Sequence, residues 1–143
     1  MINVSKSLTV SFNSQQMFNL VNDVNSYQSF VPLCVASDVL KETSSGMLAS
    51  LSFKYGLIHC SFTTDNSLIK NTEIKMQLVS GPFKKLSGLW QFIPQQNGGC
   101  TVKLQVSFLS NSRILQMALT KSLDAAINKV MQAFIARAEQ IYS

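Results

Sequence analysis

The chain has 143 residues, of which 46% are hydrophobic and 13% are charged, and its formal net charge is +5. This length suits a single domain, residues 1–143, with its own core, and the low charge excludes a disordered chain. No apolar run approaches the roughly 18 residues of a membrane span, so the surplus apolar side chains should be buried or should line a cavity.

The N-terminal part predicts one strand and two short helices. Residues Ser7–Phe12 alternate polar and apolar side chains, which is typical of a strand. Asn13 or Ser14 can then cap a short helix. Residues Asn25–Cys34 predict a second short helix or turn that ends near Pro32, because the residue before a proline disfavours the helical conformation. The buried side of the first helix should contain Met17, Phe18, Leu20, Val21 and Val24.

The middle of the chain predicts an antiparallel meander with one apolar and one polar face. The alternation changes parity at Gly56-Leu57, as a two-residue hairpin requires, because facing residues share one side of a sheet. Glycine in the first central position favours a type II′ turn. With the first strand, about seven strands result. The alternating segments are Ala36–Glu42, Met47–Tyr55, Ile58–Thr64, Ile74–Leu78, Leu86–Phe92 and Val102–Phe108.

The last thirty residues predict one long helix. From Ser112 to Tyr142 the apolar residues recur at spacings of three and four without Gly or Pro. Such a helix is about 46 Å long and about 10 Å wide. It must cover the apolar face of the sheet, and we expect either a sheet that closes tightly on the helix or a cavity between them. The recurring residues are Leu123, Ile127, Val130, Phe134, Ala138 and Ile141.

The stretch Leu78–Phe92 predicts a hairpin that turns at Gly81-Pro82, with Phe83 at the mouth of the cavity. Gly88 occupies an inward position and should leave space beside the Trp90 ring, whose buried N–H needs a partner. Bulky aromatics and flexible methionines on the inward face are the mixture that apolar ligand sites use. The residues expected to bind a ligand are Leu51, Phe53, Tyr55, Phe62, Met76, Phe83, Leu86, Trp90, Phe92, Leu104, Met131 and Phe134.

The pattern contains no catalytic arrangement, so we expect neither an enzyme nor a metal site nor a cofactor. His59 has the parity of the polar face, opposite to Ile58 and Cys60. No nucleophile–histidine–carboxylate set, paired carboxylates or glycine-rich phosphate loop emerges. Cys60 points inward, where a cysteine is usually inert packing.

Four lysines, Lys75, Lys84, Lys85 and Lys103, share the outer parity of the sheet or lie at its rim. They favour an anionic partner such as a ribosome or, transiently, a membrane surface. Solvated lysines on an exposed sheet remain the ordinary alternative. The outward aromatic residues that stack on RNA bases are missing, and no DNA binding is expected.

The three cysteines, Cys34, Cys60 and Cys100, lie far apart and predict neither a disulfide framework nor a zinc site. The start of the chain lacks the continuous apolar core and the cleavage site of a signal peptide. A reducing cytoplasm fits this pattern best.

Several stretches resemble a known family over nearly the whole chain, from Phe18 to Tyr142. They are "FNLVNDVNSYQSFVPLC", "FTTDNSL", "MQLVSGPFKKLSGLWQF" and "MQAFIARAEQIY". The chain is similar to the bacterial RatA and coenzyme-Q-binding (ubiquinone-binding) family of START-like domains, formerly described as oligoketide cyclases or lipid-transport proteins. The family often has Tyr-Pro where this chain has Tyr27-Gln28, and a tryptophan near Leu33.

The resemblance implies an α+β helix-grip fold that encloses a hydrophobic cavity, with residues Tyr27–Cys34 at its mouth. It implies non-enzymatic binding of ubiquinone or a similar polyprenyl lipid in support of respiration. It also implies an alternative, a ribosome-association toxin of the toxin–antitoxin type that binds the large ribosomal subunit and blocks subunit joining, while the presence of an antitoxin partner is left open. A cyclase-type enzyme is a third possibility.

Overall fold

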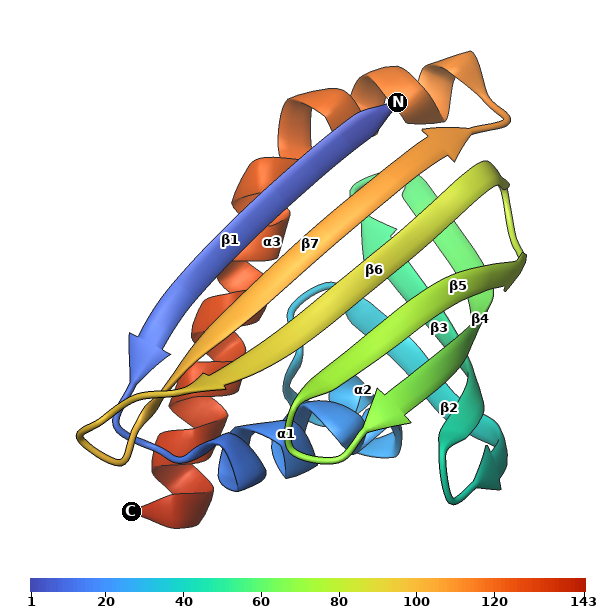
Figure 1. Cartoon of the computed structure of the whole chain (residues 1–143). Helices are drawn as coiled ribbons and strands as arrows, with labels where there is room; N and C mark the ends of the chain where they lie inside the picture. Colours follow the sequence, from blue (N-terminus) through green and yellow to red (C-terminus); the bar gives the residue numbers. More distant parts are fainter.

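The computed structural model describes the backbone of residues 1–143 and every side chain except that of Tyr55. The predicted α+β architecture is confirmed: a curved antiparallel sheet of seven strands with two short helices at one end and one long helix across its concave face (Figure 1). The strands are β1 (Ile2–Val10), β2 (Cys34–Thr43), β3 (Gly46–Tyr55), β4 (Ile58–Ile69), β5 (Glu73–Ser80), β6 (Phe83–Pro94) and β7 (Cys100–Ser110). The helices are α1 (Ser14–Asn22), a 3₁₀ turn (Val24–Ser26), α2 (Tyr27–Phe30) and α3 (Arg113–Tyr142).

The sheet is a meander to which the first strand returns. Its order is β1-β7-β6-β5-β4-β3-β2, so β2 to β7 follow the chain and β1 pairs with the last strand. The predicted β3–β4 hairpin is present, with Leu51 opposite Phe62 and Phe53 opposite Cys60. Gly56 has a φ of 60°, while Leu57 has no positive φ, as a type II′ turn requires.

Helix α1 begins at the predicted cap. The Asn13 side chain accepts a hydrogen bond from the Gln16 backbone N–H (2.8 Å), and the Gln16 side chain accepts one from the Asn13 N–H (2.9 Å). This reciprocal pair satisfies two backbone donors that a helix start leaves open. It orients α1 so that Met17, Phe18 and Val21 are buried against the sheet.

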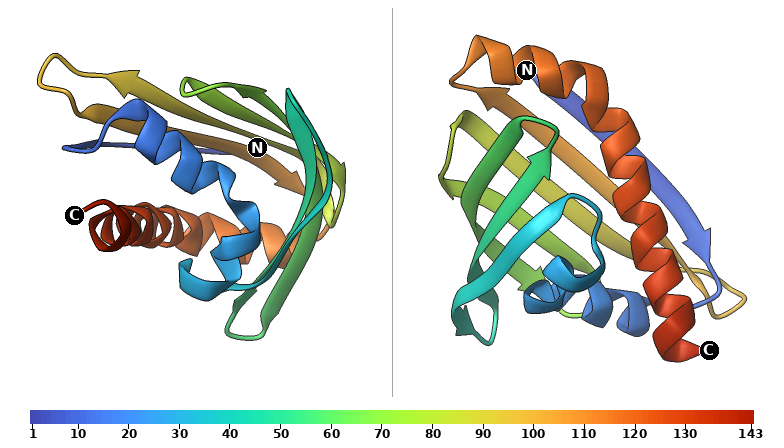
Figure 2. Two further views of the ribbon diagram at one scale, coloured as in Figure 1. Left: turned by 90° about the horizontal axis from the view of Figure 1, so that it is seen from below. Right: turned by 180° about the vertical axis from the view of Figure 1, so that it is seen from behind.

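Helix α3 crosses the concave side of the sheet at an angle (Figure 2), and its two halves pack differently. Its fully buried residues, Met131, Phe134 and Ala138, all lie in the C-terminal half. Near its end, the Tyr142 hydroxyl donates to the Gln16 carbonyl at 2.9 Å and so joins α3 to α1. The N-terminal half contributes only partly buried apolar residues to the hydrophobic clusters, at Leu115, Leu119, Leu123 and Ile127.

A β-bulge at Lys84 changes the expected position of Phe83. Phe83 pairs with Ser110 and Lys85 pairs with Leu109, so Lys84 is an extra residue in the strand. The extra residue turns both Phe83 and Leu86 inward although they are three positions apart. Phe83 is 8% exposed, packs edge-on against Phe62 and Phe108 and lies on the cavity wall; its place at the cavity mouth stays a prediction.

Candidate ligand cavity

A cavity of about 230 Å³ lies between the concave face of the sheet and α3. Strands β3 to β7 form its floor, α3 covers it, and α1 with the α2–β2 connection closes one end. Its wall is almost entirely apolar, which is the character of small-molecule sites in proteins. Of the residues predicted to bind a ligand, those on the cavity wall are Leu51, Phe53, Phe62, Met76, Phe83, Leu86, Trp90, Leu104 and Phe134.

Phe92 and Met131 are placed elsewhere. Each is 2% exposed and belongs to the packed core, not to the cavity wall. For Phe92 the reason is α1: the Phe18 ring packs edge-on against it at 5.7 Å and fills the space that the sheet alone would leave open. The prediction for Tyr55 falls on a side chain outside the described residues.

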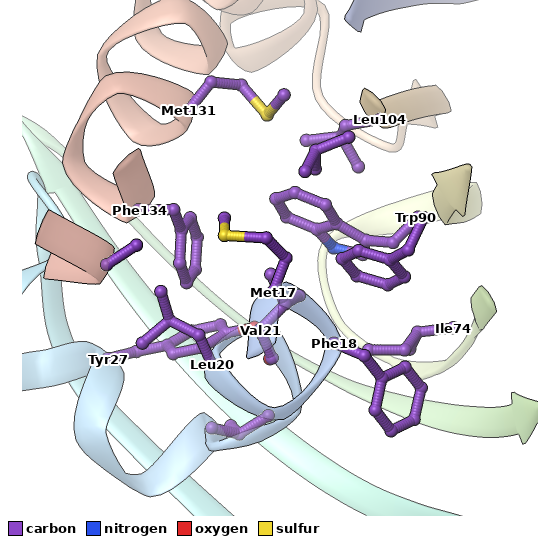
Figure 3. Close-up of a cluster of buried hydrophobic side chains, with 14 of the residues drawn as sticks. Met17, Phe18, Leu20, Val21, Tyr27, Ile74, Trp90, Leu104, Met131 and Phe134 are labelled. Carbon is purple, nitrogen blue, oxygen red and sulfur yellow. The ribbon is translucent and has the colours of Figure 1, made fainter. Parts of the chain in front are cut away.

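Trp90 lies where the cavity meets the packed core. It is 5% exposed, stacks on Phe92 and meets the Phe134 ring edge-on at a centroid distance of 5.4 Å. Figure 3 shows it among Leu104, Met17 and Phe134, with side chains from α1, α3 and the sheet converging on it. Residues from three layers thus hold the indole ring in one place.

The space predicted beside the Trp90 ring is filled by another side chain. Met76 lies directly opposite Gly88 in the β5–β6 pair. A Cβ atom at position 88 would collide with the Met76 terminal methyl group, Cε. Gly88 is therefore needed to accommodate Met76, and the expectation of empty space at this position is wrong.

Two polar side chains on the cavity wall were not identified from the sequence. Thr64 and Asn66, each 4% exposed, lie on the inner face of β4, and the Thr64 hydroxyl donates to Asn66 Oδ1 at 2.7 Å. The signal was available: both have the inward parity of Cys60 and Phe62, where polar residues are unexpected. Buried polar groups of this kind require hydrogen-bond partners.

The titratable residues on the described part of the wall are Tyr27 and Cys60. Burial, followed by the charges of Asp23 and Cys34, raises the pKa of Tyr27 far above its usual range, and its hydroxyl donates to the Val21 carbonyl. Burial alone raises the pKa of the Cys60 thiol to about 11. Both groups are neutral at physiological pH, so neither is poised for acid–base or nucleophilic chemistry.

His59 is exposed on the other face of β4, as its parity predicts. Among the described side chains, no group of three His, Cys, Asp or Glu is arranged to hold a metal ion.

Among the described residues, helix α3 has no extensive packing against β3 or β4. Helix α3 packs mainly on β1, β7 and α1. Between α3 and the β3–β4 hairpin, the wall is made by Leu33, by Ile58 of the hairpin and by Leu119 and Ala126 of α3. Leu33 has a φ of 69°, a left-handed conformation that costs a non-glycine residue about 1–2 kcal/mol. Its carbonyl accepts a hydrogen bond from the Lys54 N–H at 2.9 Å.

The four lysines predicted to form a basic surface occupy two places. Lys75 lies opposite Leu89, and Lys103 lies opposite Gln91, both near the middle of β6. Exposed Lys84 and Lys85 lie at the start of β6, roughly 13–20 Å away at 3.3 Å per residue. The four lysines therefore do not converge on one spot.

A broader positive region surrounds these lysines. The sequence contains no Asp or Glu between Glu73 and Asp124, whereas Lys75, Lys84, Lys85, Lys103, Arg113 and Lys121 fall within this interval. The interval covers most of β5, all of β6 and β7, and the start of α3.

None of the helices in the described part of the chain is long and apolar enough to cross a membrane.

Comparison with known proteins assigns this chain to a family. Residues 10–135 match the sequence profile of the family described as polyketide cyclase / dehydrase and lipid transport. The chain is 40% identical over 139 residues to the ribosome association toxin RatA of Vibrio cholerae serotype O1, covering 97% of this chain and 96% of the relative. It is 28% identical over 145 residues to the mitochondrial coenzyme Q-binding protein COQ10 homolog B of Xenopus laevis, covering 99% of this chain and 59% of that protein.

The fold also has close counterparts among solved structures. A START superfamily protein from Mycobacterium smegmatis superposes with a TM-score of 0.83 at 17% identity, over 97% of this chain and 98% of that chain. The predicted START-like fold is thereby confirmed, and this chain belongs to the polyketide cyclase / dehydrase and lipid transport family, with RatA and coenzyme-Q-binding proteins among its relatives.

Proposed function

We propose that this protein binds a polyprenyl quinone such as ubiquinone, or a similar lipid, in the cavity beneath α3 and does not transform it. The observation that carries the proposal is the apolar cavity beneath α3 with a buried tryptophan in its wall. The lipid-transport description of the family and the coenzyme-Q-binding name of one relative support it. A role in support of respiration follows from such a ligand.

The size of the cavity limits how the ligand is held. About 230 Å³ is just below the usual 300–1,000 Å³ of ligand pockets. It suits a ring with the first units of a tail, and a longer tail must leave on the side of Leu33 and Ala126. Each 100 Å² of apolar ligand surface removed from water contributes about 2.5 kcal/mol, so binding needs no catalytic group.

A cyclase-type reaction is the less favoured use of the same cavity. It would need an acid or base beside the ligand, whereas Tyr27 and Cys60 both have raised pKa values. A cyclising activity that persists in Trp90→Ala but disappears in Cys60→Ala would reverse this preference.

The ligand proposal is tested by purifying the protein from cells under native conditions, extracting it with organic solvent and analysing the extract by mass spectrometry. We expect a quinone or related lipid in stoichiometric amount, and much less in a variant whose cavity is filled, Ala126→Phe. An extract of the folded wild-type protein that contains no lipid, together with no binding of added ubiquinone, would refute the proposal.

Ribosome association is a second candidate, and it would use the outside of the molecule. The name of the 40% identical relative supports it, and so does the acid-free interval with its six basic residues. Such an interaction with the large subunit would rest on phosphate contacts and would weaken with salt.

Sedimentation with large ribosomal subunits at low and high salt tests this second candidate. Lys84→Glu/Lys85→Glu should abolish co-sedimentation at low salt, because both side chains are exposed in the positive region. Lys41→Glu/Lys70→Glu, an equal charge reversal at exposed positions outside it, is the matched control and should have little effect. Equal losses in the two double variants would indicate a non-specific charge effect and contradict a defined site.

A further inference from the structure

The polar residues of the cavity wall indicate which chemical group of a ligand they contact. We propose that Asn66, oriented by Thr64, and Trp90 form a donor pair that binds carbonyl oxygens, so that the cavity selects a quinone or ketone over a hydrocarbon of the same shape. This inference rests on the proposed ligand-binding function and specifies the ligand's head group.

Asn66 is an amide in an apolar place. It is 4% exposed, and its neighbours across the ladder are Met47 on β3 and Met76 on β5. An amide taken out of water without hydrogen bonds loses free energy relative to an apolar residue of the same size. Its presence on this wall therefore calls for a partner on the ligand side.

The Thr64 hydroxyl determines which end of the amide is available. It donates to Asn66 Oδ1 at 2.7 Å, so the acceptor of the amide is already used. The amide nitrogen carries two N–H donors. The hydrogen bonds found among the described residues include none from this nitrogen, and it is not among the fully enclosed atoms that lack partners. It therefore borders the cavity.

Trp90 supplies a second donor under the same conditions. Its indole nitrogen can only donate, the residue is 5% exposed on the cavity wall, and the hydrogen bonds among the described residues include none from it. Asn66 and Trp90 lie two strands and one inward row apart, because Asn66 pairs with Met76, and Ile74 pairs with Trp90. Strand spacings put their Cα atoms about 12 Å apart, and both side chains lie on the wall of the same cavity.

Two donors complement carbonyl oxygens, and a quinone presents such acceptors at both ends of its ring. The wall also carries one acceptor without a partner, Asn22 Oδ1, so the donor pair selects against a hydrocarbon and not against a hydroquinone. Water can also occupy this site. If the two donors bound only water and no ligand carbonyl, the protein would bind a quinone and a hydrocarbon with equal affinity.

The test compares two probes by isothermal titration calorimetry: a short-chain ubiquinone and a benzene ring that carries the same prenyl tail without oxygens. Wild type should bind the quinone roughly 10-fold more tightly, the usual effect of pairing otherwise unsatisfied buried donors. Asn66→Leu and Trp90→Phe should each remove most of this preference, measured as the ratio of the quinone and hydrocarbon affinities within the same variant.

Two further variants complete the design. Thr64→Val keeps the shape of the side chain but frees the Asn66 amide to turn, and should reduce the preference by a smaller factor; it also serves if Asn66→Leu does not fold. Leu86→Met, a volume-conserving change in the wall, is the control and should alter both affinities equally.

The outcomes separate this inference from the proposed function. Equal affinity of wild type for both probes, or a preference that survives Asn66→Leu and Trp90→Phe, overturns the donor pair while ligand binding stands. Failure of both probes to bind overturns ligand binding and, with it, the donor pair.

Discussion

The two halves of α3 make different use of one continuous helix. The C-terminal half buries Met131, Phe134 and Ala138, and Phe134 meets Tyr27, Phe30 and Trp90 edge-on at centroid distances of 5.2, 5.3 and 5.4 Å. The N-terminal half has no fully buried residue and lays half-buried leucines over the cavity. The C-terminal half holds the fold together, and the N-terminal half covers the cavity.

This difference shows how the protein can keep an unfilled interior without losing stability. Close packing is concentrated where α1, α3 and the sheet meet (Figure 3). The cavity lies towards the other end, where fewer contacts are lost by leaving space. Changes in the two halves should therefore affect stability and ligand binding to different extents.

The largest loss of stability should follow from removal of the Phe134 ring. Phe134→Ala should lower the free energy of unfolding by about 3–5 kcal/mol, because it opens a void among well-packed rings. Leu119→Ala, in the half that covers the cavity, should cost only about 1 kcal/mol, because the side chain is half-buried beside existing space. Denaturant titration of both variants measures the contrast. Equal losses would mean that the two halves pack alike.

The second prediction uses the cysteines of the two regions. Cys60 lies on the cavity wall, whereas Cys100 is fully buried where α1 meets the sheet. Because burial raises the Cys60 pKa to about 11, about two units above an ordinary thiol, its alkylation at pH 8 should be about 100-fold slower than that of a free thiol. A bound ligand should slow the reaction of Cys60 further and leave that of Cys100 unchanged.

The same raised pKa has a consequence for stability. The folded protein keeps the Cys60 proton that the unfolded chain loses, so the free energy of unfolding should fall as pH rises from about 9 to about 11. Cys60→Ala should reduce this part of the pH dependence. If iodoacetamide modifies Cys60 in the folded protein as fast as in the urea-unfolded chain, the thiol is not enclosed as described.

A third prediction concerns the contact between Gly88 and Met76. Gly88→Ala places a methyl group where the Met76 terminus now lies, and the flexible side chain must move towards the cavity. The cost in stability should be about 1 kcal/mol, at the low end for overpacking, but the smaller cavity should bind a short-chain ubiquinone more weakly. Denaturant titration and calorimetry with a short-chain ubiquinone on this variant separate the two effects. Unaltered quinone affinity in Gly88→Ala would show that Met76 does not border the bound ligand.

The smallest effect should come from the ion pair between the sheet and the covering half of α3. Lys6 Nζ lies 3.1 Å from Asp124 Oδ1, and the Asp124 side chain is 75% exposed. Exposed pairs contribute about 0–1 kcal/mol and are screened by salt. Asp124→Asn should therefore change the free energy of unfolding by less than about 1 kcal/mol at low salt and by less still at 1 M NaCl. A larger, salt-independent loss would mean that this half of α3 is held more firmly than its packing indicates.

Alternation of side chains was enough to predict most of the fold. The parity of β3, β4 and β6 and the periodicity of α3 identified the sheet, the hairpin at Gly56-Leu57 and the covering helix, because each is a local pattern repeated over many residues. Parity alone also placed Leu51, Phe62 and Trp90 on the cavity wall. These predictions required no knowledge of contacts between distant segments.

The features that the sequence did not predict depend on contacts between distant segments. The bulge at Lys84 is defined by pairing with β7, the cover over Phe92 comes from Phe18 on α1, and the space at Gly88 is filled by Met76 across the strand pair. The Thr64–Asn66 pair differs, because its inward parity was readable and only its meaning was missed. A short polar pair within an apolar face is therefore the signal to look for in related sequences.

Quenching of the Trp90 fluorescence by a short-chain ubiquinone tests the central claim most directly, since this is the only tryptophan of the chain and lies on the cavity wall. The account predicts saturable quenching in wild type, and its loss in Ala126→Phe, whose added ring occupies the cavity without adding a tryptophan. Quenching that does not saturate, or that is equal in the two proteins, would contradict a ligand site beneath α3.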